Sequence, residues 1–330
     1  MNQRMPIRFA GTGAYMPDEV ITNEHFAGYL DTSDEWIQTR TGIRERRKSR
    51  EEEYTSVLAR KAAERAVEDA GMDPKDLDLI ICATATPDYL FPSTSSVIQG
   101  KLGAVNAGAF DISAACAGFM HAAAAASGLI CSGIHKTVLV IGAERLTRFI
   151  DNRERGTVVI FGDGAGAAVL THSTTPEQAV LYCNLGCDGT RTEDIWLPAG
   201  GARFPASHET IDGRKHYMHM RGRDVYKFAV VKIIKEIERA LEATGLKAGD
   251  LKLVIPHQSN LRIIESVREK MGLPMEQFAV NIDRYGNTSA ASVPVALDEA
   301  RRAGRVGDGD LVLMIALGAG LTWGTMIIQL

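Results

Sequence analysis

Cys116 is the strongest candidate for a nucleophile in this sequence. It lies within residues 110–133, after a short predicted strand and before an apolar stretch, residues 117–130, with the composition of a buried helix. At such a strand-to-helix turn the helix N–H groups are unpaired and the helix dipole favours negative charge, which lowers the pKa of a thiol. The alternative is a small core cysteine, since free cysteine is among the most buried residue types.

His257 and Asn287 could act together with Cys116. His257 follows an apolar strand in IPHQSN, and Asn287 precedes a small-residue helix in YGNTSAAS. Each has a structural alternative, a packed histidine and a helix N-cap. In a proteolytic site the amide would orient the imidazole, whereas two donors aimed at one carbonyl oxygen would stabilise an enolate or oxyanion.

An internal repeat indicates how the fold positions these residues. Each copy has a helix end, a glycine cap, a polar turn and an apolar strand. Strands that alternate with helices predict an α/β fold with mostly parallel, covered sheets, and duplication would bring the strand ends together at a central seam. The matched segments are 69–85 with 243–259, 138–141 with 312–315, and the segment ending at Cys116 with 278–292.

The remaining elements follow from local patterns. Helices are predicted near 23–29, over 53–70 and over 224–245, strands over 7–16 and 78–84, and loops with short strands over 176–219. The glycines of FGDGAGAAVL resemble a dinucleotide-binding motif. Because they join two β-type runs, TVVIF and AAVL, we predict a tight turn between antiparallel strands and discount NAD.

Composition limits the partners. The 330 residues are 45% hydrophobic and 24% charged, with a formal net charge of −4, so neither nucleic acid nor an anionic membrane is expected as a partner. No apolar run approaches the ~20 residues of a membrane span. Five cysteines without a CxxC pair predict a reducing, cytoplasmic location. No metal site is expected, because Cys183 and Cys187 lack a second ligand pair.

Two basic segments could bind anionic ligands. Residues 32–47 combine Trp36 with several arginines, which could stack a base and hold phosphates, or form only a capped helix with a solvated charged face. The predicted helix over 224–245 is basic near its start, where positive charge opposes the helix dipole. That pattern indicates an acidic partner, although a solvated face is the commoner explanation.

Six motifs carry a resemblance to a known family. SAACAGF, PHQSNLRI, YGNTSAAS, FGDGAGAAVL, GAGLTWG and TSDEWIQTRTGIRER resemble those of β-ketoacyl-acyl-carrier-protein synthase III, the initiating condensing enzyme of type II fatty acid synthesis. The resemblance implies a thiolase fold, a duplicated five-layer α-β-α-β-α arrangement, and a homodimer. It divides the chain into an N-terminal half, 1–175, with the nucleophile, and a C-terminal half, 176–330, with the histidine and asparagine.

The resemblance also implies site residues. Cys116, His257 and Asn287 would be catalytic, and the backbone N–H groups of Cys116 and Ala319 would form the oxyanion hole. The remaining positions implied are Trp36, Arg40 and Arg155 for coenzyme A, Lys227 and Arg262 for the acyl carrier protein, and Phe91 (from the dimer partner), Leu146 and Phe161 for the acyl pocket.

The implied reaction is a decarboxylative Claisen condensation without a cofactor. The Cys116 thiolate would take an acyl group from acyl-CoA, and malonyl-acyl carrier protein would then lose carbon dioxide to give the attacking enolate. The alternatives are an acyltransferase of secondary metabolism, a Cys–His–Asn thioesterase and a non-catalytic acyl-carrier-binding protein. A thiolase proper is excluded, because it needs a second active cysteine near the C-terminal glycine loop and the last cysteine is Cys187.

Overall fold

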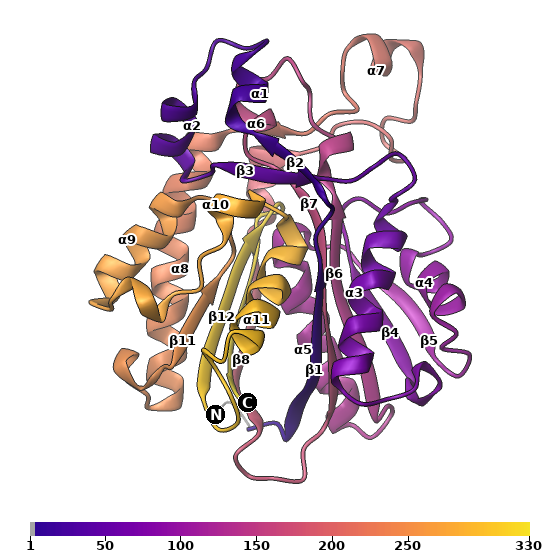
Figure 1. The fold of residues 1–330 in the computed structure, drawn as a ribbon, viewed down its shortest axis with the longest axis vertical. Helices are drawn as coiled ribbons and strands as arrows, with labels where there is room; N and C mark the ends of the chain where they lie inside the picture. Colours follow the sequence, from indigo (N-terminus) through magenta and orange to yellow (C-terminus); the bar gives the residue numbers. More distant parts are fainter. Residues whose placement is uncertain (1–3) are drawn as a thin grey trace.

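The computed structural model describes residues 4–330, which fold into two large sheets and three layers of helices (Figure 1), with two further two-stranded sheets, β2-β3 and β9-β10. The first sheet has the order β1-β7-β6-β4-β5. Its strands β4, β5 and β6 are parallel, and β7 is antiparallel to both β6 and β1. They are β1 (Ile7–Tyr15), β4 (Leu79–Ala83), β5 (Gly108–Ile112), β6 (Thr137–Arg145) and β7 (Asp163–His172).

The second sheet repeats this pattern in the order β11-β12-β13-β8. Its strands are β8 (Ala179–Cys187), β11 (Leu253–Pro256), β12 (Leu311–Gly318) and β13 (Thr322–Gln329). β11 and β12 are parallel, and β13 is antiparallel to β12 and β8. The place of β5 is taken by one parallel bridge between Val254 and Phe278. The expected duplication is therefore present, whereas the division at residue 175 stays a prediction.

The helices form the outer and middle layers. The outer helices are α3 (Thr55–Asp69) and α4 (Thr94–Leu102) on the first sheet, and α8 (Gly222–Thr244) and α9 (Leu261–Met271) on the second. Between the sheets lie α5 (Gly118–Cys131) and α11 (Ser292–Arg302), each of which contacts strands of both sheets. This is the five-layer thiolase arrangement, and it explains why the apolar α5 is covered on both sides.

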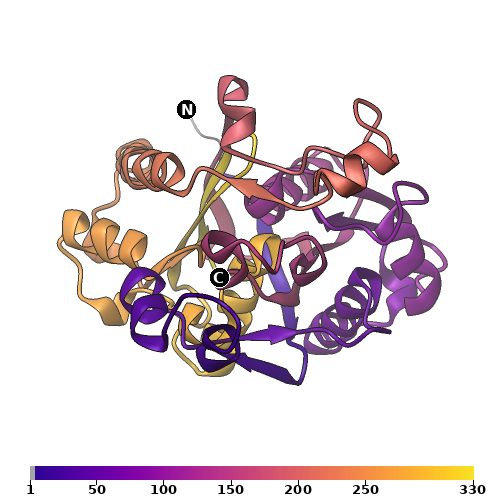
Figure 2. The ribbon, with the colours of Figure 1, turned by 90° about the horizontal axis from the view of Figure 1, so that it is seen from above.

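A cap covers one end of the two sheets (Figures 1 and 2). Part of it packs in an apolar cluster that includes Phe26, Ile37 and Leu146. Its elements are β2 (Glu19–Thr22), α1 (Asn23–Ala27), α2 (Asp34–Thr41), β3 (Glu45–Lys48), α6 (Arg155–Val158), β9 (Ile195–Trp196), α7 (His208–Asp212), β10 (His219–Met220) and α10 (Ile282–Tyr285).

Two local predictions are wrong. The glycines of FGDGAGAAVL do not form a turn between strands, because residues 155–158 are helical and the glycines Gly164 and Gly166 lie inside the single strand β7. A Cβ at Gly166 would stand 2.7 Å from the backbone nitrogen of Val295, so this glycine lets α11 approach the sheet. Residues 176–219 are also more regular than expected, because they contain the nine-residue strand β8, which pairs along its length with β13.

Candidate active site

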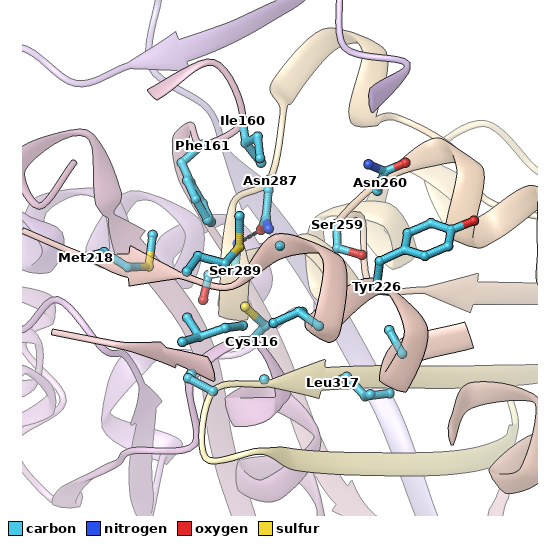
Figure 3. Close-up of a pocket in the computed structure, with 18 of the residues that line it drawn as sticks. Cys116, Ile160, Phe161, Met218, Tyr226, Ser259, Asn260, Asn287, Ser289 and Leu317 are labelled. Carbon is cyan, nitrogen blue, oxygen red and sulfur yellow. Dashed lines mark hydrogen bonds between the residues drawn. The ribbon is translucent and has the colours of Figure 1, made fainter. Parts of the chain in front are cut away.

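One cavity of about 650 Å³ collects the three candidate catalytic residues. Cys116, His257 and Asn287 all line it, although they come from different halves of the chain. Figure 3 shows Cys116, Asn287 and Ser289 close together, with Tyr226, Ser259 and Asn260 to one side. The duplicated fold therefore brings the ends of equivalent segments to a common site.

Cys116 lies at the predicted strand-to-helix turn, in the short 3₁₀ turn Ala115–Ala117 before α5. Ala115 has a φ of 45°, so the turn is sharp. The end of β12 packs directly against it, because a Cβ on Gly318 would stand 2.6 Å from the carbonyl oxygen of Ala114. The Thr322 hydroxyl donates a hydrogen bond to that same carbonyl at 3.0 Å.

The low thiol pKa expected at this turn is not found. Burial raises the pKa of the Cys116 thiol to about 12, although the nearby Ser289 hydroxyl and the Cys116 backbone N–H oppose the effect. Near neutral pH the nucleophile is therefore a thiol, and acylation requires that its proton be removed.

His257 is held as a neutral imidazole. Its backbone N–H donates to Ile315 O at 2.7 Å, and its Nδ1 lies 2.7 Å from the Ser292 hydroxyl. Burial lowers the pKa of His257 to about 3, which excludes the imidazolium near neutral pH. When Nδ1 accepts from Ser292, the proton sits on Nε2 and makes it a hydrogen-bond donor.

Asn287 is oriented by the turn that it precedes. Its Oδ1 accepts a hydrogen bond from the Ser289 N–H at 2.8 Å, which leaves the Nδ2 group to donate elsewhere. Its backbone is fixed by bonds from its N–H to Ile160 O and from Gly162 N to its carbonyl. Imidazole and amide thus offer donors in one cavity, the arrangement that stabilises a developing enolate.

Ala319 follows the Gly318 contact and lines the same cavity as Cys116. A backbone N–H needs no particular side chain, so alanine is compatible with the predicted oxyanion hole. That role stays a prediction.

The predicted acyl-pocket residues divide into two groups. Leu146 and Phe161 are buried and line the cavity, while Phe91 is 86% exposed and is not among its lining residues. The sequence did not identify several further apolar residues that line the cavity, because they lie on short cap elements without periodicity: Phe149, Ile160, Trp196, Leu197, Met218 and Met220.

The predicted coenzyme A residues lie around one aromatic ring. Ser33 caps α2 by accepting a hydrogen bond from Trp36 N, as expected of Thr32 or Ser33. The Arg155 and Arg40 guanidinium carbons lie 4.6 Å and 5.8 Å from the Trp36 ring centroid. Trp36 and Arg40 line the cavity. Because Arg155 covers one face of the Trp36 ring, a base stacked on that face would have to displace the guanidinium. Coenzyme A binding by these residues stays a prediction.

One basic residue of α8, Lys232, makes contacts within the protein. The Lys232 amine lies 3.0 Å from Glu236 and 3.6 Å from the Trp323 ring centroid. By contrast, Lys227 and Arg262 are exposed and line the cavity, together with Arg223. Docking of an acidic carrier on these three cations stays a prediction.

Four buried polar residues near the site were missed by the sequence reasoning. Ser289 and Ser292 bond to Asn287 and His257. Gln258 joins the end of β11 to residues 279–281 through its side-chain amide, and Glu144 accepts a hydrogen bond from Ser289. The two serines were visible in YGNTSAAS, but Glu144 had no signal beyond its place after an apolar strand.

Within residues 4–330 no cluster of three or more His, Cys, Asp or Glu residues has metal-binding geometry, and no helix there is long and apolar enough to cross a membrane. Cys183 lies half-buried on β8 and Cys187 is exposed at its end.

Comparison with known proteins identifies the family. The models for 3-oxoacyl-[acyl-carrier-protein] synthase III and its C-terminal region match residues 110–189 and 241–330. The curated β-ketoacyl-[acyl-carrier-protein] synthase III of Caldanaerobacter subterraneus subsp. tengcongensis is 47% identical over 100% of this chain and 99% of its own. That of Clostridioides difficile is 48% identical over 97% of both chains.

Solved structures agree with these matches. The 3-oxoacyl-[acyl-carrier-protein] synthase III of Aquifex aeolicus VF5 has a TM-score of 0.90 and 44% identity, over 98% of this chain and 100% of that one. The priming β-ketosynthase of the R1128 polyketide pathway has a TM-score of 0.91 and 38% identity, over 100% and 98%. The chain therefore belongs to the β-ketoacyl-acyl-carrier-protein synthase III family.

Proposed function

We propose that the protein condenses an acyl-CoA primer with malonyl-acyl carrier protein and so initiates fatty acid synthesis. The observation that carries the proposal is that Cys116, His257 and Asn287 line one cavity, with the imidazole neutral and the amide oxygen of Asn287 already engaged. This leaves one nucleophile and two hydrogen-bond donors for a thioester.

In the first half-reaction Cys116 attacks the acyl-CoA carbonyl. The backbone N–H groups of Cys116 and Ala319 stabilise the tetrahedral oxyanion, and coenzyme A leaves as its thiolate. Trp36, Arg40 and Arg155 bind the nucleotide end of coenzyme A, and the apolar walls around Leu146 and Phe161 hold the acyl chain.

In the second half-reaction malonyl-acyl carrier protein docks on the surface that includes Lys227 and Arg262. His257 Nε2–H and Asn287 Nδ2–H donate to its thioester carbonyl, so loss of carbon dioxide leaves a stabilised enolate. The enolate attacks the acyl group on Cys116, and a 3-ketoacyl-acyl carrier protein is released. The reaction requires no further cofactor.

The proposal includes a homodimer and a cytoplasmic location. The exposed side chains Tyr89, Leu90 and Phe91 form an apolar loop that a partner subunit would cover, with Phe91 entering the partner's acyl pocket. The cysteines Cys82, Cys116, Cys131, Cys183 and Cys187 are unpaired, which supports a reducing compartment.

A second candidate is an acyltransferase that primes secondary metabolism. It is favoured by the full-length similarity to the R1128 priming β-ketosynthase. The two functions differ in the acyl group taken, which depends on cavity shape, and one methylene changes selectivity by only ~1–3 kcal/mol.

The test is intact-protein mass spectrometry with acyl-CoAs of increasing length, for the wild type and Cys116→Ala, followed by malonyl-acyl carrier protein. We expect an adduct that requires Cys116 and disappears as the 3-ketoacyl product forms, and the fastest-forming adduct identifies the primer. An adduct that decays to free acid without malonyl-acyl carrier protein would indicate a thioesterase instead. Absence of any adduct would contradict the proposal.

A further inference from the structure

Glu144 is a buried carboxylate directly behind the nucleophile, and the mechanism above assigns it no part. It lies near the end of β6 with none of its surface exposed. Its neighbour Arg145 points its guanidinium to Ser49 and to the backbone carbonyls of residues 50 and 51 instead. Within residues 4–330 Glu144 forms no ion pair, so a buried acid here needs another explanation.

The partners of Glu144 are neutral donors. Its Oε2 accepts a hydrogen bond from the Thr86 hydroxyl at 2.6 Å, and Ala85 N lies 3.2 Å from both carboxylate oxygens. Because Thr86 Oγ1 itself accepts from Arg145 N at 2.9 Å, its proton is directed to Glu144. The hydrogen bonds from Ala85 and Thr86 therefore fix the position of the Glu144 carboxylate.

The remaining oxygen connects Glu144 to the active site. The Ser289 hydroxyl donates to Glu144 Oε1 at 3.0 Å. Ser289 also lines the cavity beside Cys116 (Figure 3), where its hydroxyl lowers the pKa of the Cys116 thiol. Ser289 has a φ of 50°, a strained conformation that recurs at functional sites. Ser289 therefore lies between the Cys116 thiol and the Glu144 carboxylate, and its hydroxyl is bonded to the carboxylate.

We propose that Glu144 is a positioning residue for the acylation half-reaction, acting through the Ser289 hydroxyl to accept the Cys116 proton. The inference rests on the proposed function. As Cys116 attacks, its S–H proton passes to Ser289 Oγ while the Ser289 proton passes to the Glu144 carboxylate. The serine hydroxyl then donates to the thiolate, and protonated Glu144 donates to the serine.

The proton balance closes over one turnover. Coenzyme A leaves as a thiolate and takes a proton from solvent. When the enolate later displaces Cys116 as a thiolate, the proton stored on Glu144 returns through Ser289 and restores both the thiol and the carboxylate. One solvent proton is consumed per condensation, as the loss of carbon dioxide from a malonyl carboxylate requires.

The electrostatics of the site suit this task. Burial raises the pKa of Glu144 to about 7 although Thr86, Ala85, Ser289 and Ala290 donate to it, and burial also raises that of Cys116. The other titratable group that its charge reaches is the Cys82 thiol on β4, which Asp111 and Asp88 also influence. Asp163, on β7 beside Arg145, is bonded to Ser49 and Thr147 instead.

The test separates the half-reactions. Single-turnover acylation of Cys116 by the preferred acyl-CoA is followed by mass against pH for the wild type, Glu144→Gln, Glu144→Asp and Ser289→Ala. Decarboxylation of malonyl-acyl carrier protein is measured in a Cys116→Ala background, where no acylation occurs. Asp163→Asn is the matched control. It neutralises a second buried acid, which is bonded to neither Ser289 nor Cys116.

We expect the wild-type acylation rate to rise with pH through about pH 7, and Glu144→Gln to lose this rise and acylate at least about tenfold more slowly. Decarboxylation stays within about twofold of the wild type, and Glu144→Asp recovers part of the pH dependence. Ser289→Ala, which keeps Glu144 in place, slows acylation similarly and serves if Glu144→Gln does not fold.

Two results would overturn the inference. One is that the folded Glu144→Gln and Ser289→Ala variants acylate at the wild-type rate and with the wild-type pH profile. The other is an equal loss of both half-reactions in them, which marks a purely structural role. If the wild type itself is not acylated, the proposed function fails instead, so the two failures are distinguishable.

Discussion

At the scale of single residues, the site contains one nucleophile, Cys116, and two hydrogen-bond donors, His257 and Asn287, with different roles. Burial keeps Cys116 protonated and His257 neutral, with pKa values of about 12 and about 3. Because neither group is ionised near neutral pH, neither adds a charge to the wall that faces the apolar acyl chain.

His257→Ala should abolish malonyl-acyl carrier protein decarboxylation and leave acylation of Cys116 near the wild-type rate, because the imidazole donates only to the enolate. Since the pKa of His257 is about 3, wild-type decarboxylation should show no inflection near the ordinary histidine value. Rate–pH profiles of the two half-reactions check both points. An inflection there that disappears in His257→Ala would mean that the imidazolium is the working form.

At the scale of elements, the catalytic turn is held by close backbone contacts at glycines, where no side chain would fit. The end of β12 touches the Cys116 turn at Gly318, and β6 touches the turn after Asn287 at Gly142, where a Cβ would stand 2.2 Å from Ala290 O. Close packing of this kind transmits small shifts to the reacting atoms.

Gly318→Ala should slow acylation by about a hundredfold, because its Cβ would stand 2.8 Å from the Cys116 backbone nitrogen and displace the oxyanion hole. Gly307→Ala is the matched control, since nothing lies within 4 Å of a Cβ there. Single-turnover mass spectrometry measures the effect. Equal rates for the two variants would show that the contact does not set the geometry.

Glu53, just before α3, predicts an acid-dependent stability. Burial favours the neutral acid, but hydrogen bonds from Lys61, Tyr15 and the Arg50 N–H prevail and lower the pKa of Glu53 to about 2. Its contribution is therefore complete above the unfolded value of 4.5 and lost as pH falls through about 2. Chemical denaturation should show that Glu53→Gln removes up to about 3 kcal/mol of this dependence, whereas exposed Glu52→Gln does not.

At the scale of the molecule, the exposed loop at residues 89–91 is where the proposed homodimer can be tested. Leu90 and Phe91 are 79% and 86% exposed, more than an isolated subunit ordinarily leaves on one loop. The cavity of one chain also lacks Phe91 as a lining residue. A partner subunit would cover the loop and complete the acyl pocket.

Phe91→Asp should weaken the homodimer and reduce acylation by longer acyl-CoAs, because it places a charge in the partner's apolar pocket. Sedimentation velocity and acylation rates measure the two effects. Ile134→Asp, at a site that is 67% exposed after α5, is the control. A wild type that sediments as a monomer at all concentrations would contradict the homodimer.

The sequence alone determined the repeat, the helices α3, α5 and α8, and the strand-end positions of Cys116, His257 and Asn287. Local apolar patterns and short motifs are properties of neighbouring residues, so they can be read without coordinates. For the same reason the family resemblance was visible in six separate motifs.

Only the tertiary structure decided what surrounds those residues. The glycines of β7 predict a turn when the sequence is considered alone. In the structure Gly166 lies inside the strand and lets α11 pack against it. The pKa of the Cys116 thiol is raised by burial, and that burial depends on both halves of the chain. Glu144 and Ser289 are 145 residues apart and meet only when the two sheets assemble, so their contact leaves no pattern in the sequence.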